Sequence, residues 1–185
     1  MTHPPQTRHR PSIRLPGYDY ASPGAYFVTI CAHSKECVFH VPELRDAVEE
    51  AWRQIPLHCP NAGLDEFVVM PNHVRGIVWI VGAQHAAPLP AARTVAVTPA
   101  SLGAIVRSFK SAATRHVNEF RHAPGAAVWQ RNYYERVIRD DDELSSIREY
   151  IHINPLRWEL DRENPRRVAS REHTRQWGWL EGGQE

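Results

Sequence analysis

Apolar runs and amphipathic stretches alternate along the chain in an order that predicts a mixed α and β fold. Residues 24–32, GAYFVTICA, are dense in β-branched and aromatic residues after a Pro-Gly break and predict a buried strand. Residues 41–58 then repeat apolar positions at the spacing of one helical face, and Pro42 suits the first turn. This stretch predicts a helix of about four turns.

The middle of the chain reads as a hairpin followed by a long helix. Two apolar runs, residues 64–70 and 74–82, are separated by a short polar break at 71–73, which is a hairpin signal. Residues 82–100 are rich in Ala and Pro without a sustained period and predict a surface loop. A helix is predicted next, capped by Thr98 or Ser101. Its apolar stripe comprises Leu102, Ile105, Val106, Phe109, Ala113, Val117 and Phe120.

The last predicted elements complete a recognisable order. Residues 127–139 are aromatic and β-branched and predict a fourth strand, and the acidic residues 140–142 suit the start of a helix that stops at Asn154, before Pro155. Strand, helix, strand, strand, helix, strand is the split βαβ, ferredoxin-like arrangement. We therefore expect an α+β fold: a four-stranded antiparallel sheet with helices on one face, plus an extra C-terminal helix.

The length and net charge of the chain limit its domain number and the kinds of partner it can bind. A chain of 185 residues suits a single domain, here 1–185, with a core over about 12–158 and a basic tail over 159–185 to which no structure is assigned. The net charge of +1 excludes a global basic field, so an anion site must be local. The polar start and the absence of a long apolar run favour a cytoplasmic protein without membrane contact. The three cysteines are expected to be thiols.

Two pairs of side chains are candidates for chemistry. His73 and Arg75, two apart on a predicted strand, would share one face, and Tyr150 and Asn154 would share one face of the last helix. If that helix crosses the hairpin, the four side chains converge. Each also has an ordinary structural explanation: a hydrogen-bonded histidine at a strand end, an amphipathic core tyrosine, or an asparagine cap before proline.

Longer motifs add a resemblance. The segments VVMPNHVRGIV, WQRNYYERVIRDDDEL and REYIHINPLRW, preceded by RLPGYDYASPGAYFVTICA, resemble the IS200-like single-tyrosine (Y1, HUH-type) transposases, and within them the REP-associated tyrosine transposases. The resemblance runs from about Ser12 to Trp158, with the motifs in the family's order. It implies DNA transposition: binding, cleavage and transfer of single-stranded hairpin (REP-like) DNA through a 5′-phosphotyrosine. The sequence leaves open whether the protein is a monomer or a homodimer.

The resemblance also implies a set of site residues. It makes Tyr150 the nucleophile, and it makes His73 and Asn154 ligands of a divalent metal, Mg²⁺ or Mn²⁺. The family's second metal-binding histidine falls on Arg75, and a guanidinium has no lone pair to offer a metal. Two outcomes remain open. Arg75 repels the ion and leaves a catalytically weakened DNA-binding relic, or its fork holds the scissile phosphate directly. We expect weakened metal binding, because one of three protein ligands is lost.

Nucleic-acid contact is expected from cations and aromatic rings near these motifs. The residues predicted to bind DNA are Arg75, Arg107, Lys110, Arg131 and Arg136. Trp129, Tyr133 and Tyr134 could stack on bases, or could simply be the alternating residues of a packed strand. The cations of the long helix could equally form a solvated face. An RNA-recognition module is disfavoured because its basic, glycine and aromatic signature is missing.

Overall fold

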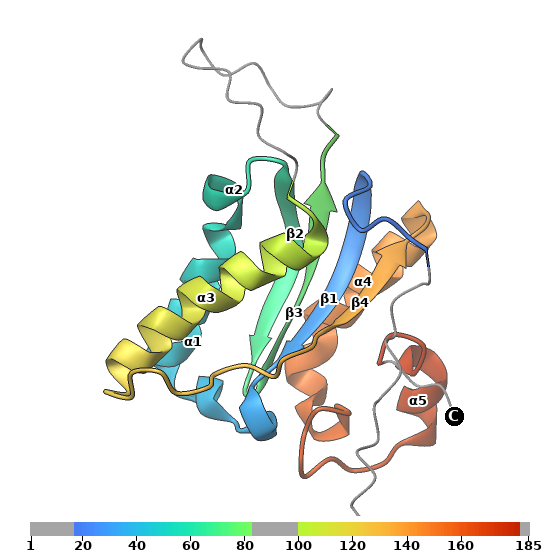
Figure 1. Ribbon diagram of the computed structural model, residues 1–185. Coiled ribbons are helices and arrows are strands. Elements are labelled where there is room, and N and C mark those ends of the chain that lie inside the picture. The colour runs from blue at the N-terminus through green and yellow to red at the C-terminus, as the bar shows by residue number, and fades with distance from the viewer. Residues whose placement is uncertain (1–16, 83–99, 182–185) are drawn as a thin grey trace, which may run out of the picture.

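The computed structural model describes residues 17–82 and 100–181, and its described part is an α+β fold built around one sheet (Figure 1). The strands are β1 (Gly24–Cys31), β2 (Ala62–Met70), β3 (His73–Ile80) and β4 (Tyr134–Ile138). The α-helices are α1 (Pro42–Arg53), α2 (Ile55–His58), α3 (Leu102–Phe120), α4 (Asp141–Ile153) and α5 (Arg171–Trp177). Short 3-10 turns are η1 (His33–Lys35), η2 (Val38–His40) and η3 (Asn154–Leu160).

The sheet has the strand order β2-β3-β1-β4, and each neighbouring pair is antiparallel. This order and the succession β1, α1, β2, β3, α3, β4 are those of the ferredoxin-like split βαβ arrangement. β3 is a central strand that pairs with both β1 and β2, and it is buried along almost its whole length. The predicted fold class is confirmed, and it places the His73 to Arg75 segment at the centre of the sheet.

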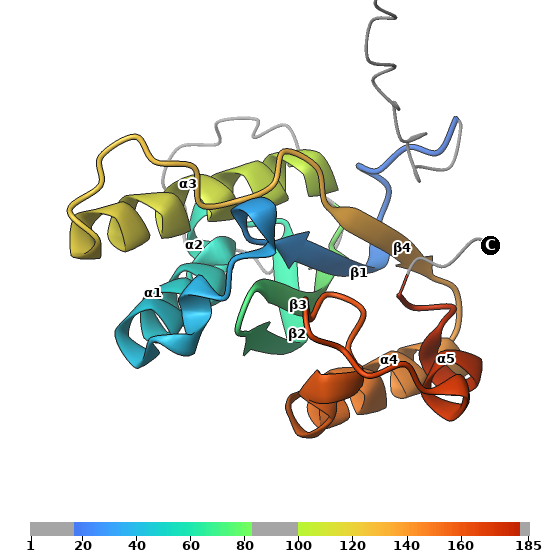
Figure 2. The same ribbon diagram turned by 90° about the horizontal axis from the view of Figure 1, so that it is seen from below.

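Helices cover both faces of the sheet. α1 and α3 pack on one face over a core that includes Val28, Val78, Trp52 and Phe109. α4 and α5 lie on the other face, over a smaller core around Phe27 (Figure 2). The two helices of the split βαβ units thus share a face, as predicted, and the extra C-terminal helix α4 occupies the opposite one.

Several boundaries differ from the sequence prediction. The predicted helix over 41–58 is broken at Gln54 into α1 and the short α2, which has Pro56 in its first turn. The strand predicted over 127–139 begins only at Tyr134, and before it Trp129 makes an isolated bridge to Ala32. Phe120, assigned to the buried stripe of α3, is 51% exposed at the helix end. The predicted loop at 82–100 and the start of the predicted core lie largely outside the described residues.

Candidate functional site

Strand alternation directs His73 and Arg75 toward α4. The intervening Val74 belongs to the core beneath α1 and α3, whereas Ile77, two positions beyond Arg75, belongs to the core beneath α4. Because side chains two apart share a face, His73 and Arg75 point to the α4 side. Both are almost fully buried, with Arg75 only 2% exposed, so the strand carries a permanent charge into the interior.

Helix α4 and its C-cap supply the other two residues, Tyr150 and Asn154. The N-terminus of α4 is fixed by Asp140, whose carboxylate accepts a hydrogen bond from the Glu143 backbone N–H at 2.8 Å. One turn apart near its C-terminus, Tyr150 and Asn154 both face the sheet and are buried. Arg75 Nη1 donates to Asn154 Oδ1 at 2.7 Å, and the Arg75 guanidinium carbon lies 5.0 Å from the Tyr150 ring centre. The predicted convergence of strand and helix therefore occurs.

Asp161 is a site residue that the sequence analysis missed. It is fully buried just after η3, and both of its carboxylate oxygens accept hydrogen bonds from the Arg75 guanidinium. Burial raises the pKa of this carboxyl, but the charge and hydrogen bonds of Arg75, with smaller effects of His73 and the Glu163 backbone N–H, together lower it below its ordinary value. The available signal was indirect: a buried arginine requires a carboxylate partner, but no spacing rule identifies one this far along the chain.

The segment after η3 is held against the β2–β3 turn by Asn72. The Asn72 amide donates to the carbonyl of Glu163 at 2.7 Å and to the carbonyl of Lys35 at 3.1 Å. Its Oδ1 lies 2.8 Å from Nδ1 of His73. The asparagine of the PNH sequence thus orients the imidazole and the Asp161-bearing segment together, so the part of the chain beyond Trp158 is integral to the site.

His73 is a neutral imidazole in this environment. It is fully buried, and burial together with the positive charge of Arg75 lowers its pKa to about 3. Asp161, whose Oδ2 lies 3.8 Å from His73 Nε2, opposes this shift without reversing it. With Nδ1 bonded to Asn72, Nε2 makes no hydrogen bond to any residue in the described part of the chain.

The Tyr150 hydroxyl belongs to a second small network. It donates to Oε1 of Glu181 at 3.2 Å, and the same oxygen lies 2.9 Å from Nε2 of His173 on α5. Trp177 packs against the Tyr150 ring with 5.3 Å between ring centres. Burial raises the pKa of Tyr150, and the Glu181 carboxylate adds to that effect, while Arg75 opposes it. Tyr150 is therefore a protonated phenol covered by the C-terminal segment.

The residues present do not fit the divalent metal that the resemblance implies. Asn154 Oδ1, one of the two remaining expected ligands, already accepts from Arg75, and the guanidinium lies between strand and helix where an ion would have to bind. Within residues 17–82 and 100–181, no group of three or more His, Cys, Asp or Glu side chains could hold a metal ion. Arg75 thus takes the Asn154 oxygen that the resemblance assigns to the metal.

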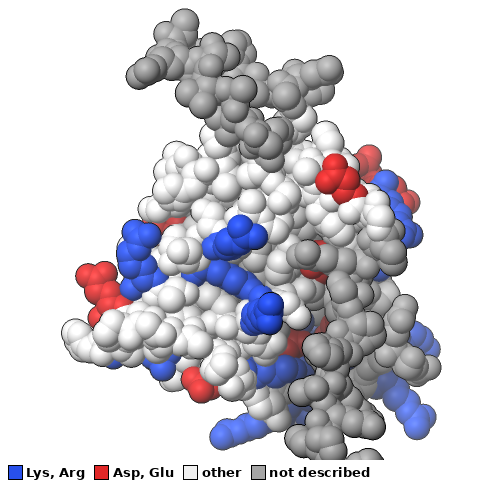
Figure 3. All heavy atoms as spheres, viewed as in Figure 1, with Lys and Arg blue, Asp and Glu red and all other residues white. Residues whose placement is uncertain are grey.

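The remaining residues predicted to bind DNA are distributed over both faces of the molecule. Arg107 is exposed on α3, on the face away from Tyr150, and Figure 3 shows Lys and Arg side chains on the face that α3 covers. Lys110 Nζ donates to the carbonyl of Gln130 at 2.9 Å and contacts those of the next two residues, so it holds the segment before β4. Arg131 is exposed in that segment. The structure does not bring these three cations to Tyr150.

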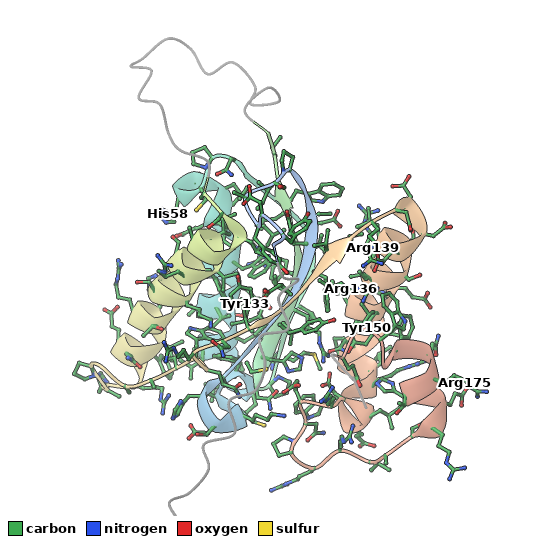
Figure 4. All side chains as sticks on the ribbon, turned by 45° about the vertical axis from the view of Figure 1, so that its right-hand side comes forward. His58, Tyr133, Arg136, Arg139, Tyr150 and Arg175 are labelled. Carbon is green, nitrogen blue, oxygen red and sulfur yellow. The ribbon has the colours of Figure 1, made fainter. Side chains whose placement is uncertain are left out.

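Arg136, in β4, lies on the face of the sheet that α4 covers. It pairs with Glu143 at 2.5 Å, and its guanidinium carbon lies 4.7 Å from the Trp179 ring centre. Figure 4 shows Arg136, Arg139 and Tyr150 on the side of β4 and α4, with His58 on the opposite side. Arg136 on β4 and Arg139 just after it thus share a side of the molecule with Tyr150.

The three candidate stacking aromatics also separate. Trp129 is 8% exposed and packs on Phe39 and Phe109 beneath α3, so it is a core residue. Tyr133 is half-buried against the same core, with Lys110 Nζ 5.6 Å from its ring centre. Tyr134 lies against the core beneath α4, edge-on to Phe27. Of the three, Tyr134 is on the Tyr150 side.

No described helix is long and apolar enough to cross a membrane.

Comparison with known proteins finds a relative that matches most of this chain. The chain is 41% identical over 167 residues to an uncharacterized protein of Haemophilus influenzae, covering 83% of this chain and 92% of the relative. The chain belongs to the same family as that protein. No family model matches the sequence.

Two solved structures are similar in arrangement. One is a REP-associated tyrosine transposase bound to a REP hairpin, at 21% identity over 77% of this chain and 72% of the other, with a TM-score of 0.46. The other is a putative transposase from Deinococcus radiodurans, at 19% identity over 75% of this chain and 95% of the other, also with a TM-score of 0.46.

Proposed function

We propose that this protein acts in DNA transposition or a process derived from it, by binding hairpin-forming single-stranded DNA and cleaving it with Tyr150. The observation that carries the proposal is the convergence of His73, Arg75, Tyr150 and Asn154, which the motif resemblance groups together, at one buried site between β3 and α4. Ordinary core packing requires no such set, because buried polar and charged groups cost free energy unless they are paired.

The proposed reaction is a transesterification at one DNA phosphodiester. Tyr150 Oη attacks the phosphorus, and the bond from phosphorus to the 3′ oxygen of the preceding nucleotide breaks. Glu181, which accepts the hydroxyl's hydrogen bond at 3.2 Å, lies on the segment that covers Tyr150, so the phenol proton passes to water and the leaving 3′ oxygen takes a proton from water. The products are a 5′-phosphotyrosine and a free 3′-hydroxyl, and the retained ester bond allows rejoining to another strand.

The burial of Tyr150 sets a condition on this reaction. Its side chain is 1% exposed, with Trp177 and Glu181 against it, so DNA can reach the hydroxyl only when the segment carrying these residues moves. Arg136 and Arg139 lie on this side of the molecule and are suited to hold the strand backbone.

Covalent capture of DNA tests the proposal. Full-length protein is incubated with end-labelled single-stranded hairpins, with Mn²⁺ and separately with EDTA, and adducts are separated on denaturing gels. We expect a labelled protein band with the wild type and none with Tyr150→Phe, because the phenylalanine ring keeps the packing but has no nucleophile. Tyr18→Phe is the matched control, since it removes a phenol hydroxyl on the other face of the sheet.

A second candidate function is hairpin binding without cleavage, and a specific observation favours it. Arg75 is neutralised by Asp161, and Tyr150 is a buried phenol with a raised pKa, so nucleophile and charge are both withheld in this arrangement. This candidate predicts salt-sensitive hairpin binding that is indifferent to Tyr150→Phe. If the wild type forms no adduct but Arg75→His does, the binding function stands and cleavage by this chain does not.

A further inference from the structure

We propose that the Arg75 guanidinium, held by Asp161 and Asn154, is the resident cation of this site in place of a divalent metal, and that its remaining donors take a phosphate oxygen. The phosphate part rests on the proposed function, because it assumes that DNA reaches the site. The metal part does not, because it concerns the folded protein alone.

The contacts fix the guanidinium from two sides. Nη1 and Nη2 donate hydrogen bonds to the two Asp161 carboxylate oxygens as a bidentate pair, and Nη1 also donates to Asn154 Oδ1 at 2.7 Å. The partners come from the strand β3, the end of α4 and the segment after η3, and so one positive charge joins three parts of the chain. A metal ion with one ligand from each part would give the same cross-link.

The same contacts exclude the ion. A divalent cation beside His73 would lie next to a permanent positive charge and would have to displace Arg75 from Asn154. Displacing Arg75 would leave the guanidinium buried without Asn154, whereas the present arrangement pairs it with a carboxylate and an amide. Asp161 and Asn154 therefore hold the guanidinium in the place that the metal would take.

The guanidinium still has donors to offer. It carries five N–H bonds, and Nε makes no hydrogen bond to any described residue although Arg75 is only 2% exposed. Among the described residues, Nη2 has a single partner, Asp161 Oδ1 at 3.2 Å. An unpartnered buried donor costs free energy, and an anion with two oxygens matches the geometry of an arginine fork. A phosphate group of the DNA backbone fits this requirement.

Metal binding is measured first, without DNA. Mn²⁺ is titrated into full-length protein, free Mn²⁺ is followed by electron paramagnetic resonance, and the melting temperature is recorded with Mn²⁺ and with EDTA. We expect the wild type to bind no Mn²⁺ at this site and to melt at the same temperature in both conditions, because only an ion that binds the folded state raises stability. Arg75→His is expected to take up Mn²⁺ and to be stabilised by it.

Controls separate the site from nonspecific effects. Arg148→His introduces the same side chain at an arginine of α4 that pairs with Asp65, and it should behave like the wild type. If Arg75→His does not fold, the wild-type titration still decides the question. The inference is overturned if wild-type protein binds one equivalent of Mn²⁺ and His73→Ala abolishes that binding.

The phosphate contact is tested with a hairpin oligonucleotide in EDTA. We expect wild-type affinity to be the same with and without Mn²⁺, and Arg75→Lys to weaken it about tenfold, because lysine keeps the charge but loses the fork. Arg75→Lys binding as tightly as the wild type would refute the phosphate contact. Failure of Tyr150 to form an adduct would refute cleavage while leaving the metal-free site intact, so the two failures are distinguishable.

Discussion

A neutral imidazole lies beside a buried guanidinium, and this pairing makes the site sensitive to acid. A protonated His73 would be a second positive charge at the site, and burial and Arg75 both disfavour it. At the residue scale the site is therefore a set of unequal polar groups: a permanent cation, a carboxylate with a lowered pKa, a neutral histidine and a protonated phenol. Each state follows from the neighbours and from burial rather than from the residue type alone.

The titration of His73 gives a prediction for stability. The folded pKa of about 3 lies below the ordinary 6.5, so the unfolded chain binds a proton that the folded chain refuses between these values. The free energy of unfolding should therefore fall as the pH drops from 6.5 toward 3, with His73 contributing up to about 4 kcal/mol.

Chemical denaturation across this pH range measures the effect. His73→Gln should flatten the pH dependence, since glutamine does not titrate, whereas His116→Gln on the exposed side of α3 should leave it unchanged. Parallel wild-type and His73→Gln curves would show that His73 is not the buried neutral group described here.

At the element scale, the central strand requires a glycine at one position. A Cβ at Gly76 would lie 2.5 Å from Cζ2 of Trp52 on α1 and 2.9 Å from Cβ of Phe67 on β2. Trp52 stacks on Phe67 at 5.7 Å between ring centres, and its six-membered ring lies next to Gly76. The missing side chain lets α1 approach β3, next to the strand position that carries Arg75.

Gly76→Ala is accordingly predicted to destabilise the protein by about 2–3 kcal/mol, because the added methyl must displace an aromatic ring in a packed core. Urea unfolding measures the loss as a lower midpoint. Gly63→Ala on β2 is the matched control, since its Cβ would meet Trp79 Cβ at an ordinary 3.4 Å. Equal losses in the two variants would contradict the close approach of α1 to Gly76.

At the scale of the whole molecule, the C-terminal segment closes the second face of the sheet. Trp177 and Leu180 are 3% and 1% exposed and join the core around Phe27 and Tyr150, and Asp161 reaches the centre of the site. The segment assigned no structure from sequence is thus packed onto the sheet. The Asn72 amide at the β2–β3 turn ties its start in place.

Two tryptophans of this segment make a sharp comparison. Trp177→Ala should lower the free energy of unfolding by about 3–5 kcal/mol, because it empties a buried site against Tyr150. Trp179→Ala should cost about 1 kcal/mol or less, since Trp179 is 37% exposed and its contact with Arg136 is a surface cation–π pair. Both are measured by thermal and urea unfolding. A larger loss for Trp179→Ala would contradict the packing described for α5.

The sequence by itself determined the features that follow from the periodicity of strands and helices. Strand alternation put His73 and Arg75 on one face, helical spacing put Tyr150 with Asn154, and apolar runs gave the order of a ferredoxin-like sheet, because these depend on fixed periods of two and 3.6 residues. The ends of elements were less predictable: Gln54 breaks a helix and Phe120 leaves its stripe, since proline geometry and tertiary burial override the pattern.

Only the tertiary structure decided the partners of those residues. Asp161 is 86 positions from Arg75, and Glu181 is 31 from Tyr150, separations at which no local rule selects one carboxylate among 21 acidic residues. Chain folding chose them by bringing the segment after η3 against β3 and α5 against α4. The sequence thus identified Arg75, Tyr150 and Asn154. Long-range packing decided that Asp161 neutralises Arg75, that the C-terminal segment covers Tyr150, and that Asn154 accepts a hydrogen bond from Arg75.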